Sequence, residues 1–102
     1  MRVFLDDIRM TPEGWVRVYW PEQAIALLET GDVELISLDY DLGDAERGTG
    51  IDVLVWLEDA VRERGFHPPE IRVHSDDRLA RIKMQMMADS IMSEGSERQD
   101  KP

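Results

Sequence analysis

The sequence predicts an α/β fold built on a short parallel β-sheet, and three observations support this. Strand-like and helix-like segments alternate along the chain, as in strand–helix–strand units with right-handed crossovers. Two apolar runs, residues 1–5 and 33–38, have the length and composition of strands buried on both faces. Each run ends abruptly in aspartate, at Asp6-Asp7 and at Asp39. Because ligands bind beyond the carboxyl ends of such strands, these aspartates predict a site.

Composition narrows the class of protein. A chain of 102 residues with 42% hydrophobic content fits one domain. No segment approaches the roughly 20 apolar residues of a membrane span, and the first residues form a strand instead of a signal peptide, so we expect a cytoplasmic protein without a membrane partner. The absence of cysteine excludes disulfides, thiolate catalysis and cysteine-bound zinc. The net charge of -10 opposes binding to a nucleic-acid backbone unless a metal reverses the local field.

The first half of the chain predicts a second strand beside the first. Residues 7–14 contain Pro and Gly, which predicts a loop. Residues 15–20 alternate between side chains for the two faces of a sheet and are rich in β-formers, which predicts a strand. Residues 21–30 form a helix, opened by Pro and closed by Gly. The loop is shorter than a usual crossover, which leaves an antiparallel second strand open. We favour the parallel arrangement, because about 3.3 Å per extended residue lets the loop return without a helix.

The second half alternates in the same way. Residues 42–50 form a polar loop with glycines, and residues 51–64 place their apolar side chains on one face of a helix. Residues 71–74 form a fourth strand, and residues 78–93 form the last helix. The chain beyond has almost no apolar residues, so we expect one domain over residues 1–93 and a disordered tail over 94–102.

The last helix carries more apolar surface than one packing face needs. Leu79, Ile82 and Met86 form one stripe, and a second stripe lies beside it. The second stripe fills the core or forms a contact surface. If the fourth strand is a sheet edge, a homodimer through that strand and the last helix would bury both. The contact residues of that dimer would be Met84, Met87 and Ile91.

The residues at the strand ends resemble the receiver domains of two-component signalling. An acidic pair follows the first strand, Asp39 follows the third in an L-D-x-x-x-G setting, and Ser75 follows the fourth. The resemblance implies a compact, flavodoxin-like, three-layer fold with sheet order 2-1-3-4, here without the fifth strand. It also implies magnesium-binding acids at Asp6 and Asp7 and a phosphoacceptor position at Asp39.

A closer resemblance is to a group of cyclic-phosphate processing receiver-like domains, and it covers residues 1 to about 91. It rests on the motifs Phe4-Leu5-Asp6-Asp7-Ile8-Arg9, Pro12-Glu13-Gly14-Trp15, Ser37-Leu38-Asp39-Tyr40-Asp41-Leu42-Gly43-Asp44, Arg47-Gly48-Thr49-Gly50 and Arg72-Val73-His74-Ser75. The group is linked to cyclic phosphate ends in RNA repair or nucleotide metabolism. This chain departs from its pattern at Tyr40, where a His is expected, and at Asp76-Asp77, where a small polar pair is expected.

The aspartates supply the hard oxygen ligands that Mg²⁺ or Mn²⁺ prefers. We expect Asp6, Asp7, Asp39 and Asp41 as metal ligands. The alternative is that strand-end aspartates cap loop amides, which suits Asp41 and Asp44 in particular.

Phosphate contacts are expected from Arg9, Thr49 and Gly50. Arg9 could instead pair with the carboxylates, and Thr49 could simply cap the helix that follows. Near Asp39, His74 is expected to act as a general acid or base, with a structural histidine as the alternative. Ser75 is expected to donate a hydrogen bond to phosphate.

The leading functional hypothesis is metal-dependent binding or processing of a cyclic or terminal phosphate on a nucleotide or RNA end, as in a cyclic phosphodiesterase or phosphohydrolase. The alternatives are a receiver that accepts phosphate on Asp39 and an adaptor without catalysis. Trp15 and Trp20, which bracket the second strand, are expected to be buried, with an aromatic platform for a base as the alternative.

Overall fold

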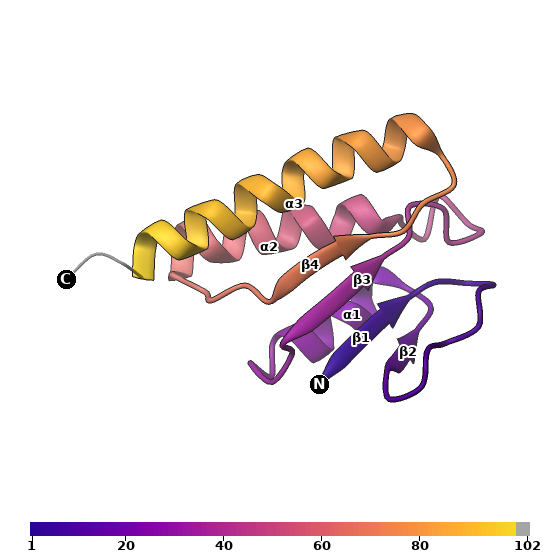
Figure 1. The fold of residues 1–102 in the computed structure, drawn as a ribbon, viewed down its shortest axis with the longest axis horizontal. Coiled ribbons are helices and arrows are strands. Elements are labelled where there is room, and N and C mark those ends of the chain that lie inside the picture. Colours follow the sequence, from indigo (N-terminus) through magenta and orange to yellow (C-terminus); the bar gives the residue numbers. More distant parts are fainter. Residues whose placement is uncertain (100–102) are drawn as a thin grey trace.

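Four parallel strands form the sheet, in the order β2-β1-β3-β4 (Figure 1). The structure is a computed structural model that describes residues 1–99. Its strands are β1 (Arg2–Leu5), β2 (Val16–Val18), β3 (Leu35–Leu38) and β4 (Glu70–Val73), and its helices are α1 (Pro21–Leu28), α2 (Gly50–Arg64) and α3 (Arg78–Gln99). The predicted α/β class, strand order and strand direction are confirmed.

The connection from β1 to β2 contains no helix, yet the two strands are parallel. Val3 is in register with Val16, and Leu5 with Val18. The Asp6 amide extends this ladder by donating to the Val18 carbonyl at 3.2 Å. The return segment contains bends and a turn but no helix, so the chain returns to a parallel strand without one, as the residue-length argument predicted.

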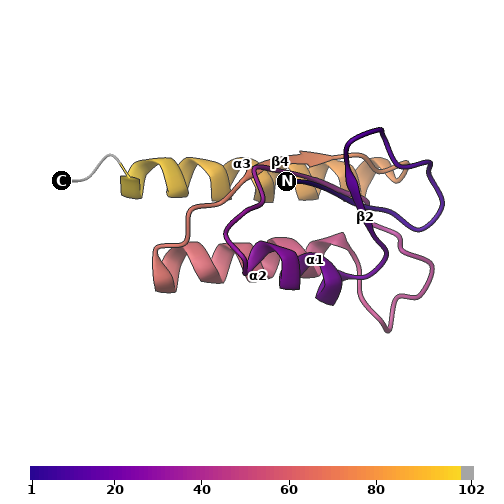
Figure 2. The ribbon, with the colours of Figure 1, turned by 90° about the horizontal axis from the view of Figure 1, so that it is seen from below.

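The main core lies on the face of the sheet that α1 and α2 cover (Figure 2). Alternate strand residues such as Leu5 and Leu38 are fully buried there, because successive side chains of a strand point to opposite faces. α2 begins after Thr49 and ends at Gly65, whose φ of 64° is the left-handed conformation that glycine adopts without steric cost.

α3 runs beside β4, along the outer edge of the sheet, instead of covering its second face (Figure 2). The Ile71 amide on that edge donates to Met92 Sδ at 3.3 Å. Within residues 1–99 no helix covers the second face, so the expected third layer is missing (Figure 2). The expected open edge at β4 is likewise covered by the protein's own helix.

The packing of α3 corrects the expected dimer contact. Met84 and Ile91 are buried in the main core, and Met87 packs against it. Met84 and Ile91 fill the space beside β4, where the described residues form no further strand, so these two side chains are not available for a contact between two copies, whereas Met87 keeps part of its surface exposed. The exposed apolar residues of α3 are Leu79, Ile82 and Met86.

α3 is also longer than the sequence predicted, because residues 94–99 continue it instead of forming a disordered tail. Tertiary contacts hold this part of the helix. A Cβ on Gly95 would come within 2.6 Å of Pro68, and Glu94 pairs with Arg62 at 3.4 Å. Residues 100–102 of the expected tail lie outside the described residues. None of the described helices is long and apolar enough to cross a membrane.

Candidate functional site

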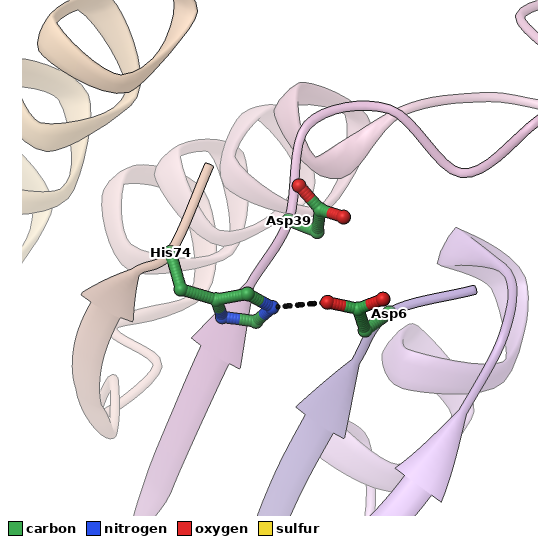
Figure 3. A group of neighbouring side chains, drawn as sticks. All are labelled: Asp6, Asp39 and His74. Carbon is green, nitrogen blue, oxygen red and sulfur yellow. Dashed lines mark hydrogen bonds and ion pairs between the residues drawn. The ribbon is translucent and has the colours of Figure 1, made fainter. Parts of the chain in front are cut away.

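Three polar side chains meet at the carboxyl edge of the sheet (Figure 3). Asp6 follows β1, Asp39 follows β3 and His74 follows β4, and each offers a ligand atom within 4.8 Å of the others. Since β3 lies between β1 and β4, the hydrogen bond from His74 to Asp6 spans the end of β3, where Asp39 lies (Figure 3).

Asp6 is fully buried and accepts hydrogen bonds from four donors. Its Oδ1 accepts from the amides of Ile8 at 2.8 Å and Arg9 at 2.9 Å. Its Oδ2 accepts from His74 Nε2 at 2.9 Å and from Arg9 Nη1 at 3.4 Å. Burial raises the pKa of this carboxyl, but the amide and histidine hydrogen bonds outweigh burial and hold the pKa below its usual value. Asp6 is therefore ionised at neutral pH.

His74 is held on three sides. Its Nδ1 lies 2.6 Å from Ser37 Oγ, and its ring stacks on Phe4 with centroids 4.6 Å apart and planes 3° apart. Burial lowers the pKa of His74, and the nearby Asp6 only partly offsets this. An ionised Asp6 can only accept, so Nε2 donates to it and Nδ1 of the neutral ring accepts from Ser37. Both ring nitrogens are thus engaged, which does not favour the predicted role as general acid or base.

Asp39 is buried, at 7% exposure, but it has far fewer donors than Asp6. Its Oδ1 accepts from the Tyr40 amide at 2.8 Å, the one hydrogen bond to this carboxylate found among residues 1–99. Burial and the charge of Asp6 raise the pKa of Asp39 to about 6. Burial and the charge of Asp6 therefore destabilise the ionised form of Asp39, which a bound cation would stabilise and a bound proton would neutralise.

Arg9 is paired within the protein. Its Nη1 donates to the His74 carbonyl at 2.7 Å, and its Nη2 pairs with Asp76 Oδ1 at 2.7 Å. With the weaker contact to Asp6, these bonds make Arg9 a clamp between the loops after β1 and β4. This matches the structural alternative for Arg9 and assigns a partner to Asp76, one of the two departures from the expected motif.

A cavity of about 250 Å³ opens beside Asp39 and has an acidic lining. Its lining residues are Asp7, Ile8, Asp39, Tyr40, Asp41, Gly43, Ser75, Asp76 and Asp77. The predicted ligands Asp7, Asp39 and Asp41 therefore share one cavity, whereas Asp6, Arg9 and His74 lie outside its lining. The cluster of Asp6, Asp39 and His74 and the lining of the cavity thus share only Asp39. The cavity is the better candidate for a metal site, because four donors already occupy the oxygens of Asp6.

The loop aspartates and Ser75 also make local turns. Asp41 Oδ1 accepts from the Gly43 amide at 2.9 Å, and Asp44 Oδ1 accepts from the Glu46 amide at 3.1 Å. Ser75 is buried, and its Oγ accepts from the Asp77 amide at 3.2 Å, which leaves its hydroxyl proton for another acceptor.

Thr49 and Gly50 begin α2 and are not in the lining of this cavity. Thr49 Oγ1 accepts from the Ile51 amide, and the Thr49 amide donates to Asp52 Oδ2 at 2.8 Å. The Gly50 amide donates to the Tyr40 carbonyl at 3.2 Å. These bonds match the capping alternative and leave the predicted phosphate contact without support.

Sequence reasoning missed Ser37 and Phe4 as supports of His74. Strand periodicity contained the signal: residues two positions before Asp6 and Asp39 share their faces of the sheet. The hydroxyl of Ser37 and the ring of Phe4 occupy those positions, so both contact the side chain of His74 at the end of β4. The pairing of Ser37 with Arg72 in register then puts His74 next to both.

Comparison with known families agrees with the motifs at the strand ends. The model of the cyclic-phosphate processing receiver domain matches residues 1–90. No curated protein and no solved structure matches the chain. Since the match spans the whole sheet and most of α3, the chain belongs to the cyclic-phosphate processing receiver domain family.

Proposed function

We propose that this domain binds a cyclic or terminal phosphate of a nucleotide or RNA end in the acidic cavity, together with Mg²⁺ or Mn²⁺, and hydrolyses it. The observation that carries the proposal is Asp39. It is a buried carboxylate with few hydrogen bonds and a raised pKa, and it lines a cavity in a domain whose family is named for cyclic-phosphate processing.

The charge of the cavity requires a cation for this function. Five aspartates line the cavity, and no Lys or Arg among the described residues does. A phosphate anion would be repelled there unless a divalent ion lay between the two. Mg²⁺ needs only one or two carboxylates and keeps several waters, so a cavity lined by Asp39, Asp7 and Asp41 fits its requirements. When bound, the ion would neutralise phosphate charge and polarise the phosphoryl oxygens.

The residues of the chain have separate roles in this proposal. Asp39 holds the cation, with Asp7 and Asp41 contributing to its shell. The hydroxyl of Ser75 donates to a phosphate oxygen. His74 and Arg9 act by position, because they fix Asp6 beside Asp39 and so keep the negative charge that attracts the cation.

A second candidate is binding of the phosphate end without turnover. Tyr40 replaces the expected histidine, and neither nitrogen of His74 is unbound. Both observations leave fewer side chains that could donate a proton to the leaving group during hydrolysis. Phosphoryl transfer to Asp39 itself has less support, because α3 occupies the edge of β4, where a receiver would place its fifth strand.

The test is hydrolysis of a 2′,3′-cyclic nucleotide with Mg²⁺ or Mn²⁺, alongside thermal unfolding with and without the ion. Replacing a residue that supports a metal ligand lowers metal affinity or activity by roughly 10- to 100-fold, and replacing the ligand itself should lower activity at least as much. Asp39→Asn should therefore reduce turnover by about 100-fold or more. The same variant should lose the rise in melting temperature that bound metal gives the wild type.

Asp44→Asn is the matched control, because Asp44 lies in the same loop but outside the cavity. Binding without product in the wild type would favour the second candidate. An equal metal response in the wild type and in Asp39→Asn would show that the site is wrong.

A further inference from the structure

The second face of the sheet carries a row of side chains that the proposed function does not use. Phe4 is in register with Arg17 on one side and with Ser37 on the other, and Ser37 is in register with Arg72. No described helix lies over this row (Figure 2). We call this surface the open face.

Aromatic rings and a guanidinium make up one half of the open face. The guanidinium of Arg17 lies 5.2 Å from the centroid of the Tyr19 ring and 5.8 Å from that of Phe4. Trp15 contacts Phe4 edge-on, with centroids 6.1 Å apart. Tyr19 is 47% exposed, so an exposed aromatic ring lies over a cation at the edge of the sheet.

Arg17 is a local positive charge in an acidic chain. No carboxylate of the described residues pairs with it, and its Nε and Nη2 are buried without a hydrogen-bond partner. On the same face Arg2 pairs with Glu34 and Arg72 with Glu70, so those charges cancel. The open face therefore has a positive charge at Arg17, in contrast to the acidic cavity.

We propose that the open face binds unstacked bases of a single-stranded nucleic acid whose phosphate end enters the acidic cavity. This proposal rests on the proposed function, since it identifies where the rest of that substrate lies. Aromatic rings and guanidinium planes on an exposed sheet stack on bases without regard to sequence. Tyr19 supplies an exposed ring, and Arg17 against it supplies the positive charge that favours a phosphate backbone.

The open face suits bases better than a protein partner. Its aliphatic and internal aromatic residues, Leu35 and Phe4, are already buried at 7% exposure, so a protein would gain little apolar area there. The open face also adjoins the cavity. Phe4 stacks on His74, and Asp7 of the cavity lies three residues after Phe4, about 10 Å along an extended chain.

The experiment measures binding of a labelled oligoadenylate of roughly eight nucleotides, within the range of one single-strand module. The probe has a 3′-hydroxyl end and the buffer contains EDTA, so neither the metal nor a terminal phosphate contributes. Tyr19→Leu keeps the apolar bulk but removes the ring, and it should weaken binding about tenfold, as expected for one lost stacking contact. Arg17→Gln should weaken binding by a similar factor.

Arg64→Gln is the matched control, because Arg64 lies 5.2 Å from the Trp56 ring on α2, away from the open face. This variant should bind like the wild type. Oligonucleotide binding by a wild type that does not hydrolyse cyclic phosphate would overturn the proposed hydrolysis but not this inference. Absence of oligonucleotide binding, or equal binding by all variants, would overturn the inference. It would also be overturned if Tyr19→Leu instead dissociated a wild-type dimer.

Discussion

Asp6 and Asp39 follow neighbouring strands and both are buried, yet they differ in the number of their hydrogen-bond donors and in the direction in which their pKa is shifted. Asp6 accepts from two amides, a histidine and an arginine, and its pKa lies below the usual value. Asp39 accepts from one amide, and its pKa is raised to about 6. The number of hydrogen-bond donors, rather than burial, accounts for the opposite pKa shifts of these two carboxylates.

The hydrogen bonds of Asp6 also stabilise the acidic edge of the sheet. The donors around Asp6 pin the loops after β1 and β4 to each other, through Arg9 and His74. These bonds stabilise the folded state, whereas the charge of Asp39 beside Asp6 destabilises it. Three substitutions test this division, in order of expected effect.

Asp6→Ala should have the largest effect. It removes a buried charge with four donors and leaves those donors unpaired, so the free energy of unfolding should fall by about 3 to 5 kcal/mol. Urea unfolding at neutral pH measures this. The control Asp41→Ala removes one exposed hydrogen bond and should cost about 1 kcal/mol or less. Similar losses in the two variants would mean that Asp6 is not an anchor.

Asp39→Asn should change how stability depends on pH. Because folding raises the pKa of Asp39 from 3.8 to about 6, the folded state binds the proton more tightly than the unfolded chain does. This stabilisation is fully present below about pH 4 and is lost as the pH rises through about 6. Without divalent ions, the wild type should therefore lose roughly 3 kcal/mol over this range relative to Asp39→Asn. A pH-independent difference between the two proteins would contradict the raised pKa.

Asp76→Asn should have the smallest effect. The side chain of Asp76 is 93% exposed, so its pair with Arg9 is screened by water and salt and should contribute less than about 1 kcal/mol. Urea unfolding at low and high salt should show a small difference that disappears with salt. A loss as large as that of Asp6→Ala would mean that Arg9 depends on Asp76 and not on the His74 carbonyl.

The fold was largely predictable from local patterns. The order of strands and helices and the aspartates at the strand ends follow from side-chain periodicity and from Pro and Gly at the turns. The parallel direction of the second strand was favoured by the reach of an extended chain, with the antiparallel alternative left open. The capping of α2 by Thr49 was also a local inference, though one left open. Within the candidate site, the sequence indicated which aspartates gather at one edge, because parallel strands end on the same side.

Only the tertiary structure decided what each of those residues does. The bond from His74 to Asp6 joins strands that are not neighbours, and it depends on Ser37 and Phe4 beneath the ring. The placement of α3 along β4 buried the apolar stripe expected at a dimer contact and left the open face uncovered. Periodicity assigns a residue to a face of its own element. It does not specify which distant donors reach that residue, and at this edge the number of donors determines whether the pKa of a buried carboxylate is lowered, as at Asp6, or raised, as at Asp39.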